Sequence, residues 1–296
     1  MSLFKEGVMR KPDKPSLLKV LMSEESLVST EENCSYTDTI VDGGALLHRI
    51  RWNKGTKFED IFCTYSRYLL KNYSNPTVIF DGYKKFTTKD QEHIRRNAIP
   101  QSSFIAINNN NEVSYTQQRY FSLTENKIEF IKFLSKHFND LGIKVINCYT
   151  DADSTIVKVA LKFAHIRTSR TLVVADDTDI AIMLLYHWKK DMEDIHLLQT
   201  CSNRIWSIKT SQLIIQDIKK HLLFIHSWSG CDTTSAIFGK GKGTIVKIMR
   251  KSSMLQHAST VITNPRSNQT EVGAASSSAF KILYGGAIQQ SLGKTR

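Results

Sequence analysis

Residues 170–188 read RTLVVADDTDIAIMLLYHW, and this stretch decides the fold class. Its first half, TLVVA, is a short apolar run rich in β-branched residues, as expected of a strand that is buried on both faces. Asp177 and Asp179 follow at once. The second half, DTDIAIMLLYHW, has the length and apolar content of a helix. A buried strand that leads through acids into a helix is the repeating unit of a parallel α/β sheet.

The same order of strand, acid and helix recurs along the chain. TIVD ends in Asp42, TVIF precedes Asp81, and VINCY comes just before the pair Asp151 and Asp153. Long amphipathic patterns separate these strands, and one of them, LTENKIEFIKFLSKHFNDL, ends at a capping glycine, Gly142. We therefore predict an α/β fold with a mostly parallel central sheet covered by helices on both faces. DIHLLQT and RIWSI read as a pair of strands near the sheet edge.

The acids are predicted to meet at one edge of this sheet. In an open α/β sheet, ligands bind at the carboxyl ends of the strands, and each motif places its aspartates there. A further acid, Asp232 in SGCDTTS, follows a long apolar helical pattern. Carboxylates that converge in this way repel one another, and hard divalent cations with oxygen ligands relieve that repulsion. The arrangement is typical of a two-metal enzyme that cleaves phosphodiesters.

The overall charge points to a polyanionic partner. The chain carries 40 lysines and arginines against 28 aspartates and glutamates, a net charge of +12. Because many acids are gathered in the motifs above, the positive excess must lie on other surfaces. Such a surface around an acidic pocket suits nucleic acid, DNA rather than RNA, that lysines bind and metals cleave. A basic surface that is merely solvated is the alternative that charge alone leaves open.

Cysteine usage and the apolar segments bear on the compartment. The five cysteines are scattered without a CxxC pair, which argues against a disulfide framework or a zinc site and favours a reducing compartment. The N-terminal MSLFKEGVMRKPDKP lacks the apolar core of a secretory signal, and IAIMLLY and HLLFIHSW are too short to span a bilayer. We expect an intracellular protein, nuclear rather than cytoplasmic, without a membrane partner.

In this order the motifs resemble those of the flap-endonuclease family of 5′-nucleases, within the PIN-like superfamily. VDGGALLH and VIFDGY resemble the first two aspartate motifs, and LGIKVINCYTDADS resembles the segment with two acids one residue apart. ADDTDIAIML resembles the later Asp-x-Asp element, with Asp176 as an extra neighbour, and GCDTTSAIFGKGKGTIVKIM resembles the helix–hairpin–helix element. Each match alone is weak, but five in the right order, from about residue 39 to residue 250, are strong.

The resemblance implies a structure-selective nuclease with two Mg²⁺ ions, or Mn²⁺ in their place, and a set of metal ligands. Asp42, Asp81 and Asp151 would hold one ion, Asp177, Asp179 and Asp232 would lie nearer the second, and Asp153 would sit between them. In such sites the ions lie roughly 3.5–4 Å apart. One ion would activate the attacking water, and the other would neutralise the leaving oxygen.

The resemblance also implies basic residues that act on the nucleic-acid backbone. Lys85 or Lys89, with Arg95 or Arg96, is expected to stabilise the charge of the transition state. In the hairpin the glycines would let backbone N–H groups approach a phosphate, while lysines add charge. These candidate nucleic-acid-binding residues are Gly239, Lys240, Gly241, Lys242, Gly243 and Lys247.

Together these patterns predict a division of the chain. Residues 1–38 form a leader of uncertain structure, and residues 39–229 form the nuclease domain with a small cap at about 82–122. Residues 230–252 form the helix–hairpin–helix element, and residues 253–296, rich in Ser, Thr, Gly and Ala, are expected to be loose or incomplete. The C-terminal AIQQSLGKTR lacks the paired aromatics of a sliding-clamp peptide, and we expect a monomer.

One departure from the family pattern, one structural explanation of the acids and two other functions bear on this hypothesis. Asp151 and Asp153 stand where the family usually has glutamates, so the metals must shift or bind partly through water. Any single aspartate is as well explained as a helix N-cap. The chain is alternatively a catalytically weak PIN-like domain that acts as a nucleic-acid-binding or protein scaffold. A phosphatase of small phosphates would need a closed pocket, and the glycine–lysine hairpin argues against it.

Overall fold

The computed structural model describes residues 4–5, 8–28, 36–82, 104–108, 111–149, 151–166 and 170–285, which form two compact units. The sheet unit comprises Val28–Ile180 and Lys189–Ser207. The helical unit comprises Met1–Leu27, Ala181–Trp188 and Ile208–Arg296. These units do not follow the predicted boundaries after residues 38, 229 and 252, because the first helix of the chain packs against the helix Lys242–Lys251. The predicted division by function stays a prediction.

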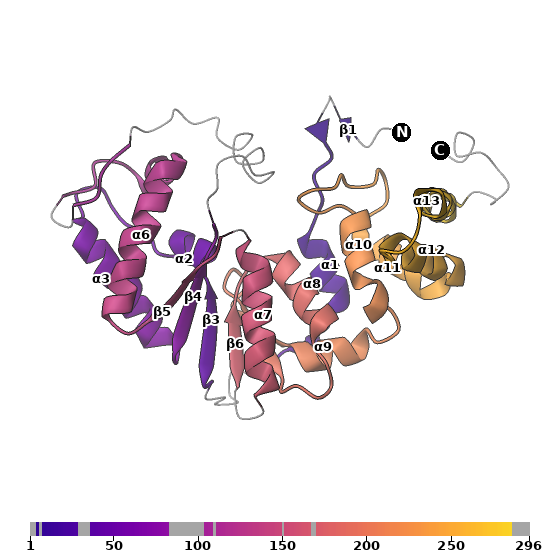
Figure 1. The fold of residues 1–296 in the computed structure, drawn as a ribbon, viewed down its shortest axis with the longest axis horizontal. Helices are drawn as coiled ribbons and strands as arrows, with labels where there is room; N and C mark the ends of the chain where they lie inside the picture. The colour runs from indigo at the N-terminus through magenta and orange to yellow at the C-terminus, as the bar shows by residue number, and fades with distance from the viewer. Residues whose placement is uncertain are drawn as a thin grey trace. The chain divides into compact units, whose positions relative to one another are not determined.

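The sheet unit is built on a six-stranded sheet (Figure 1). In spatial order its strands are β5 (Lys144–Asn147), β4 (Pro76–Phe80), β3 (Asp38–Asp42), β6 (Thr171–Val174), β7 (Ile195–Gln199) and β8 (Arg204–Ser207). The first five run parallel, and β8 pairs antiparallel with β7 at the edge. The predicted α/β fold with a mostly parallel sheet is confirmed, as is the strand pair at its edge.

Both faces of the central strands are covered. Every residue of β4 and of β6 is buried, although successive side chains point to opposite faces. One face carries Val41, Val78 and Val174, which belong to a single core with a cluster of aromatic side chains. That cluster comprises Trp52, Phe58, Phe62, Tyr65, Tyr120 and Phe130. The sheet is also packed by helix α7 (Ala152–His165), which contacts β3, β4, β6 and β7.

The sheet unit has four further helices among the described residues, and the last of them confirms the long amphipathic pattern that ends at Gly142. They are α2 (Gly43–Arg49), α3 (Phe58–Asn72), α5 (Gln117–Tyr120) and α6 (Thr124–Asp140). The chain turns after α6 at Gly142, whose φ of 76° is the left-handed conformation expected of a capping glycine. Helix α8 (Thr178–His187) follows β6, and its residues from Ala181 on belong to the helical unit.

The helical unit contains the two-stranded pair β1 (Phe4–Lys5) and β2 (Val8–Met9) and short 3₁₀ turns η1 (Glu24–Ser26) and η2 (Lys219–His221). Its helices are α1 (Pro15–Leu21), α9 (Ile208–Ile214), α10 (Leu222–Trp228), α11 (Lys242–Lys251), α12 (Ser253–Thr263) and α13 (Gln269–Tyr284). Within the described chain, no helix has both the length and the apolar content that crossing a membrane requires.

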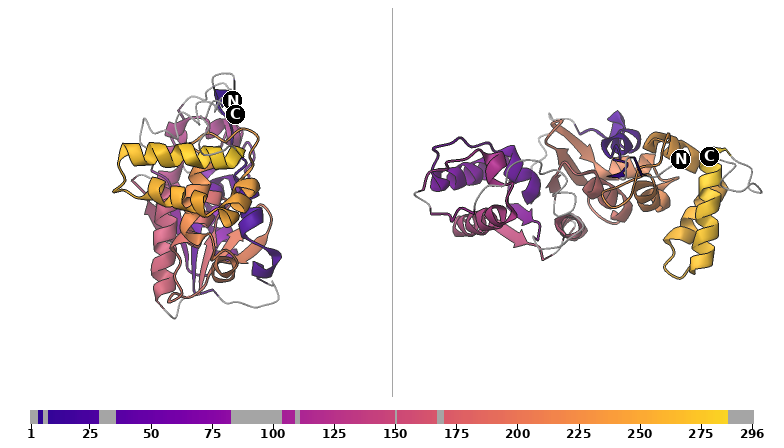
Figure 2. Two further views of the ribbon diagram at one scale, coloured as in Figure 1. Left: turned by 90° about the vertical axis from the view of Figure 1, so that its right-hand side faces the viewer. Right: turned by 90° about the horizontal axis from the view of Figure 1, so that it is seen from above.

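The C-terminal part corrects the sequence prediction. Residues 253–284 were expected to be loose, but they form the helical hairpin of α12 and α13, which lie side by side in Figures 1 and 2. Asn268 and Glu271 form a reciprocal capping box at the start of α13. The ring of Phe280 packs on Trp228 of α10. A weakly apolar, serine-rich helix is therefore ordered by its cap and by tertiary packing.

Candidate metal centre

Aspartates stand at the carboxyl ends of four neighbouring strands. Asp42 is the last residue of β3, Asp81 directly follows β4, and Asp177 follows β6. Asp151, after the edge strand β5, is the N-cap of α7. Because β5, β4, β3 and β6 are adjacent and parallel, their acids share one edge of the sheet. The structure places these four acids along one edge of the sheet, and their role as metal ligands stays a prediction.

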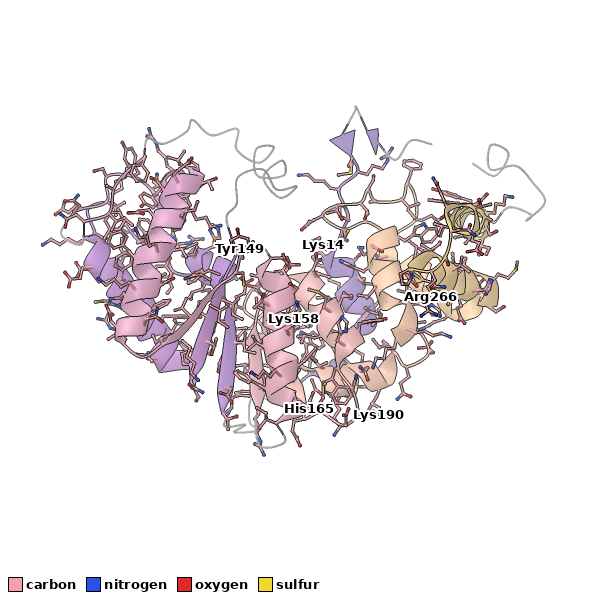
Figure 3. All side chains as sticks on the ribbon, in the orientation of Figure 1. Lys14, Tyr149, Lys158, His165, Lys190 and Arg266 are labelled. Carbon is pink, nitrogen blue, oxygen red and sulfur yellow. The ribbon has the colours of Figure 1, made fainter. Side chains whose placement is uncertain are left out.

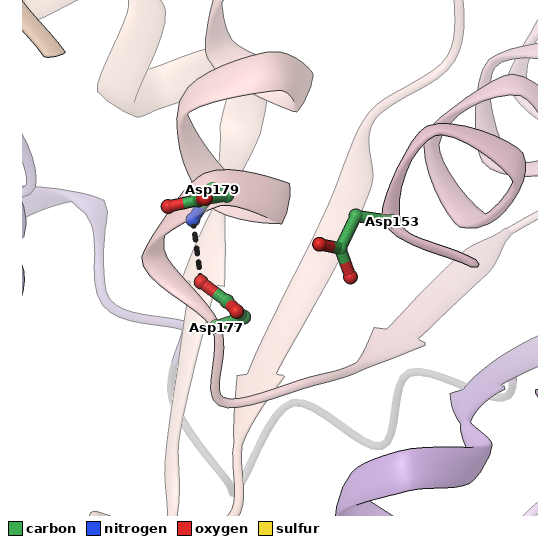
Figure 4. A group of neighbouring side chains, drawn as sticks. All are labelled: Asp153, Asp177 and Asp179. Carbon is green, nitrogen blue, oxygen red and sulfur yellow. Dashed lines mark hydrogen bonds between the residues drawn. The ribbon is translucent and has the colours of Figure 1, made fainter. Parts of the chain in front are cut away.

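Three carboxylates form a tight group at this edge. One oxygen from each of Asp153, Asp177 and Asp179 lies within 4.8 Å of the others. Figure 4 shows Asp153, on the first turn of α7, facing the other two across the gap between α7 and the start of α8. The backbone amide of Asp179 donates a 2.9 Å hydrogen bond to Oδ1 of Asp177. We call this set the acidic cluster.

The donor set of the acidic cluster fits a hard divalent cation. Carboxylate oxygens are the ligands that Mg²⁺, Mn²⁺ and Ca²⁺ prefer. Three ionised carboxylates at this separation repel one another unless a proton or a counter-ion is present. A cation held here would remove that repulsion.

Asp42, the last residue of β3, is a further acid near the acidic cluster. Its Oδ1 accepts hydrogen bonds from the backbone amides of Gly44 at 2.8 Å and Ala45 at 3.3 Å, so it caps α2. Burial raises the pKa of Asp42, those two hydrogen bonds oppose the shift, and the charges of Asp177 and Asp81 raise the pKa further. Asp42 therefore lies within electrostatic reach of both while it caps α2, and its role as a metal ligand stays a prediction.

Asp81 and Asp151 hold the start of α7. Oδ1 of Asp81 accepts a 2.9 Å hydrogen bond from the backbone amide of Ala152, and Oδ2 of Asp151 accepts one of 3.0 Å from the amide of Ser154. Burial raises the pKa of the neighbouring Cys148 thiol, and the charges of Asp81, Asp151 and Asp153 add to the shift. These three acids therefore lie within electrostatic reach of one side chain, which directly follows β5. Cys148 was not singled out as a site residue in the sequence, although it stands three residues before Asp151.

Close backbone contacts explain the glycines that follow two of the acids. A Cβ on Gly43 would lie 2.3 Å from the Phe80 ring and 2.7 Å from the carbonyl oxygen of Ile79. A Cβ on Gly82 would lie 2.4 Å from the carbonyl oxygen of Cys148 and 2.6 Å from that of Tyr149. All four distances are shorter than real contacts allow. The Asp-Gly pairs therefore let neighbouring strand ends approach, which brings their acids together.

Asp176, the extra neighbour of the Asp-x-Asp element, is hydrogen-bonded to the turn between β7 and β8. It accepts hydrogen bonds from the Thr200 hydroxyl at 2.5 Å and the Cys201 amide at 2.9 Å. Arg49 at the end of α2 donates to the Thr200 carbonyl at 3.2 Å. These contacts tie the β7–β8 turn to the strand ends that carry the acids.

Asp232 belongs to the helical unit, where it forms a 2.8 Å ion pair with Lys14. About half of its side chain is exposed, whereas Lys14 is largely covered. The role of Asp232 as a ligand of the second metal stays a prediction. Its partner, Lys14, comes from the predicted leader and could not be inferred from the motif around Asp232.

The glycine–lysine hairpin joins α10 to α11. Gly239 has a φ of 66°, Gly241 is the N-cap of α11, and Gly243 lies in its first turn. Lys247 on α11 is exposed. The ammonium of Lys240 lies 5.5 Å from the centre of the Tyr284 ring. The phosphate-binding role of these five residues stays a prediction.

Lys242 requires a correction. The sequence predicted a lysine that adds charge for phosphate binding, but Lys242 is 3% exposed. Its ammonium donates to the Gly230 carbonyl at 2.6 Å, the Ser229 hydroxyl at 2.8 Å and the His226 carbonyl at 3.4 Å. These oxygens lie at the C-terminal end of α10, where the helix dipole favours a cation. Lys242 therefore fastens α11 to α10 and does not face solvent.

Four further basic residues were predicted to act on the reacting phosphate. Lys85, Lys89, Arg95 and Arg96, and with them most of the predicted cap, lie outside the described residues. Their role at the scissile phosphate stays a prediction.

Comparisons with known proteins yield structural likeness alone. No family model and no curated protein matches the chain. The chain is similar to the catalytic core of Rad2 in complex with DNA substrate, with 15% identity, a TM-score of 0.49, and coverage of 84% of this chain and 72% of that one. It is also similar to the D15 flap endonuclease of bacteriophage T5 in a complex with DNA and metal ions, with 11% identity, a TM-score of 0.49, and coverage of 85% and 89%. A likeness of this degree says nothing about the roles of individual residues.

Proposed function

We propose that this chain is a metal-dependent nuclease that hydrolyses phosphodiester bonds in nucleic acid, DNA rather than RNA, and selects its substrate by structure. The observation that carries the proposal is the acidic cluster, with oxygens of Asp153, Asp177 and Asp179 within 4.8 Å of one another at the carboxyl edge of a parallel sheet. The net charge of +12 in spite of these acids supports a polyanionic substrate.

We propose that the acids act as two sets, each of which would hold one ion. The acidic cluster would hold the first, and Asp42, Asp81 and Asp151 would hold the second, with Mg²⁺ as the physiological ion and Mn²⁺ as a substitute. When bound, such ions activate water and neutralise charge on the phosphate.

Backbone amides of the chain orient three of the carboxylates. Backbone amides of Gly44, Ala152 and Asp179 each hold one oxygen of Asp42, Asp81 and Asp177. These hydrogen bonds fix the orientation of the carboxylates before an ion or substrate binds, which lowers the free-energy cost of ordering them during the reaction.

The backbone N–H groups near Gly239 and Gly241, with Lys240 and Lys247, are proposed to hold the phosphates of a duplex arm without reading its sequence. Lys85 or Lys89 and Arg95 or Arg96 are proposed to neutralise the reacting phosphate. We further propose a monomer that acts inside the cell, in the nucleus.

The test is cleavage of end-labelled flap, single-stranded and duplex DNA, and of matching RNA, in Mg²⁺, Mn²⁺ and EDTA. Asp179→Asn is compared with Asp191→Asn, which neutralises an exposed acid elsewhere in the sheet unit. We expect metal-dependent cleavage by the wild type and by Asp191→Asn, and its loss in Asp179→Asn. Salt-sensitive binding without cleavage in either metal would overturn the nuclease and favour the scaffold function.

A further inference from the structure

The last residue of helix α13, Tyr284, lies against the glycine–lysine hairpin. Its hydroxyl donates a 2.9 Å hydrogen bond to the carbonyl oxygen of Phe238. The ammonium of Lys240 lies over its ring, 5.5 Å from the ring centre. The next residue, Gly285, has the left-handed conformation that ends the helix, with a φ of 74°. One side chain of α13 therefore contacts the glycine–lysine hairpin twice, through its hydroxyl and through its ring.

The hydrogen bond from Tyr284 also sets the direction of a backbone donor. The carbonyl of Phe238 and the N–H of Gly239 belong to one planar trans peptide unit, so they point in opposite directions. Holding that carbonyl at the Tyr284 hydroxyl therefore turns the Gly239 N–H away from Tyr284. No described residue accepts a hydrogen bond from this N–H. A Cβ on Gly239 or on Gly241 would meet no described atom within 4 Å, so the backbone here is open to a ligand.

The N-terminal segment holds the same loop at a second point. The amide of Arg10 donates to the Ser235 hydroxyl at 3.0 Å, and the amide of Ala236 donates to the Arg10 carbonyl at 3.0 Å. The guanidinium of Arg10 lies 4.6 Å from the centre of the Phe238 ring. The conformation of the glycine–lysine hairpin is thus fixed by Arg10 and Tyr284, which lie far from it in the sequence.

The ring of Tyr284 restrains the lysine that is proposed to meet a phosphate. A lysine side chain has several rotatable bonds, and fixing them on binding costs conformational entropy. A cation over an aromatic face is attracted to that face and keeps N–H donors for an anion on its other side. Lys240, half-buried beside Tyr284, is therefore partly ordered before a ligand arrives. Such ordering lowers the entropy cost of binding and strengthens it.

We propose that Tyr284 is a positioning residue for phosphate binding at the glycine–lysine hairpin. It sets the Gly239 N–H through the Phe238 carbonyl and orders the Lys240 ammonium, so a phosphate of a duplex arm meets two ordered donors from neighbouring residues. The inference rests on the proposed function and specifies how its duplex-binding surface is organised. It also gives α13 a role in substrate binding, which the sequence did not predict.

The test measures affinity for a fluorescein-labelled, fully paired DNA duplex at several salt concentrations, in EDTA, which withholds the metal. Tyr284→Phe loses only the hydroxyl, whereas Tyr284→Leu also loses the aromatic face. Both substitutions are made in the wild type, in Lys240→Met and in Lys247→Met. Lys247 lies on α11 and has no contact with Tyr284 among the described residues.

Two matched controls lie in the C-terminal helices. Phe280→Leu removes the ring that packs on Trp228, so it loosens α13 where it meets α10. Arg266→Gln removes an exposed positive charge in the turn between α12 and α13, at the opposite end of α13 from Tyr284 (Figure 3). The first control tests for a merely structural effect, and the second tests for a general effect of charge.

We expect Lys240→Met to reduce the slope of log affinity against log salt by about 0.9, the value for one phosphate contact. Tyr284→Phe should weaken binding by roughly 2- to 10-fold, and Tyr284→Leu should weaken it further. In Lys240→Met the two Tyr284 substitutions should cost the same, because the ring has no cation left to order. In Lys247→Met each should cost as much as in the wild type. Both controls should bind as the wild type does.

The contrary outcomes are separable. Wild-type affinity in Tyr284→Leu would refute the inference, as would an equal loss for Tyr284→Leu in the wild type and in Lys240→Met. A loss in Phe280→Leu as large as that in Tyr284→Leu would mean that the docking of α13, and not the two contacts of Tyr284, supports binding. The nuclease stands in all three cases. A wild type that binds no duplex overturns the inference, and if it also cleaves no DNA or RNA in Mg²⁺ or Mn²⁺, the proposed function fails as well.

Discussion

The backbone amide of Asp179 donates a hydrogen bond to the carboxylate of Asp177, two residues earlier in the chain. The bond closes the turn between β6 and α8 and sets both side chains toward Asp153 on α7. The acidic cluster is therefore a product of two local structures, the β6–α8 turn and the first turn of α7. Each can be tested separately.

Neutralising Asp153 should separate metal binding from folding. Asp153→Asn removes one of three repelling carboxylates, so the free energy of unfolding in EDTA should rise by about 1 kcal/mol. The stabilisation that saturating Mg²⁺ gives the wild type, about 2.7 kcal/mol at one hundred times Kd, should disappear. Urea unfolding with and without Mg²⁺ measures both effects. Equal Mg²⁺ stabilisation in Asp153→Asn and in the control Asp191→Asn would show that the ion binds elsewhere.

The half-buried Asp42 should make metal-free stability depend on pH. Burial and the charges of Asp177 and Asp81 raise its pKa above 3.8, so the folded protein holds this proton more tightly than the unfolded chain does. The contribution of Asp42 to stability is then greatest below pH 3.8 and is lost as the pH rises through the folded pKa.

Asp42→Asn removes this dependence and keeps an oxygen for the amides of Gly44 and Ala45. In EDTA at neutral pH the variant should be more stable than the wild type, and the difference should shrink as the pH falls toward 3.8. Urea midpoints across this range measure it. A difference that grows in acid would contradict the raised pKa.

Replacing Lys242 should affect folding rather than binding. Lys242→Met leaves the oxygens of Ser229 and Gly230 buried without their donor, which should cost roughly 2–3 kcal/mol of unfolding free energy. Lys247→Met, on the exposed side of the same helix, should leave stability unchanged and weaken DNA binding. Urea midpoints and salt-dependent affinities distinguish the two. A Lys242→Met protein with wild-type stability would restore this lysine as a candidate for phosphate contact.

A methyl group on Gly82 should disturb the acids without touching them. The added carbon would meet the carbonyl oxygen of Cys148 at 2.4 Å, so β4 and β5 must move apart at the ends that carry Asp81 and Asp151. We expect Gly82→Ala to lose roughly 1–3 kcal/mol of stability and to bind Mg²⁺ more weakly.

Gly273→Ala is the control for that substitution. Gly273 lies inside α13, and an added carbon would meet no described atom within 4 Å. The helix should gain about 0.5–1 kcal/mol from the change. Thermal unfolding with and without Mg²⁺ compares the two variants. A stable Gly82→Ala protein with normal Mg²⁺ affinity would mean that the strand ends are not tightly packed.

The fold could be predicted because its signals are local. TIVD, TVIF and TLVV are apolar runs followed by acids, and the structure has β3, β4 and β6 at those places. The helical hairpin at the C-terminus was missed because its composition is weakly apolar. A local signal was present in the capping box of Asn268 and Glu271, which marks the start of α13.

The burial of Lys242 could not be predicted from local sequence signals. A lysine between two glycines is typical of an exposed loop. Its burial depends on Ser229 and Gly230, which lie 13 and 12 residues earlier in the chain. Tyr149 is the opposite case, since it ends an apolar run that predicts burial and yet is exposed at the end of β5.

By itself the sequence determined that aspartates follow the strands, because strand patterns and the residues after them are read from neighbouring positions. The tertiary structure alone decided that one carboxylate oxygen each of Asp153, Asp177 and Asp179 lies within 4.8 Å of the others and that Asp42 is half-buried within electrostatic reach of Asp177. These distances depend on the order β5-β4-β3-β6 and on the close approach at Gly43 and Gly82. Strand order and close approach arise from pairing between segments far apart in the chain, which no local pattern encodes.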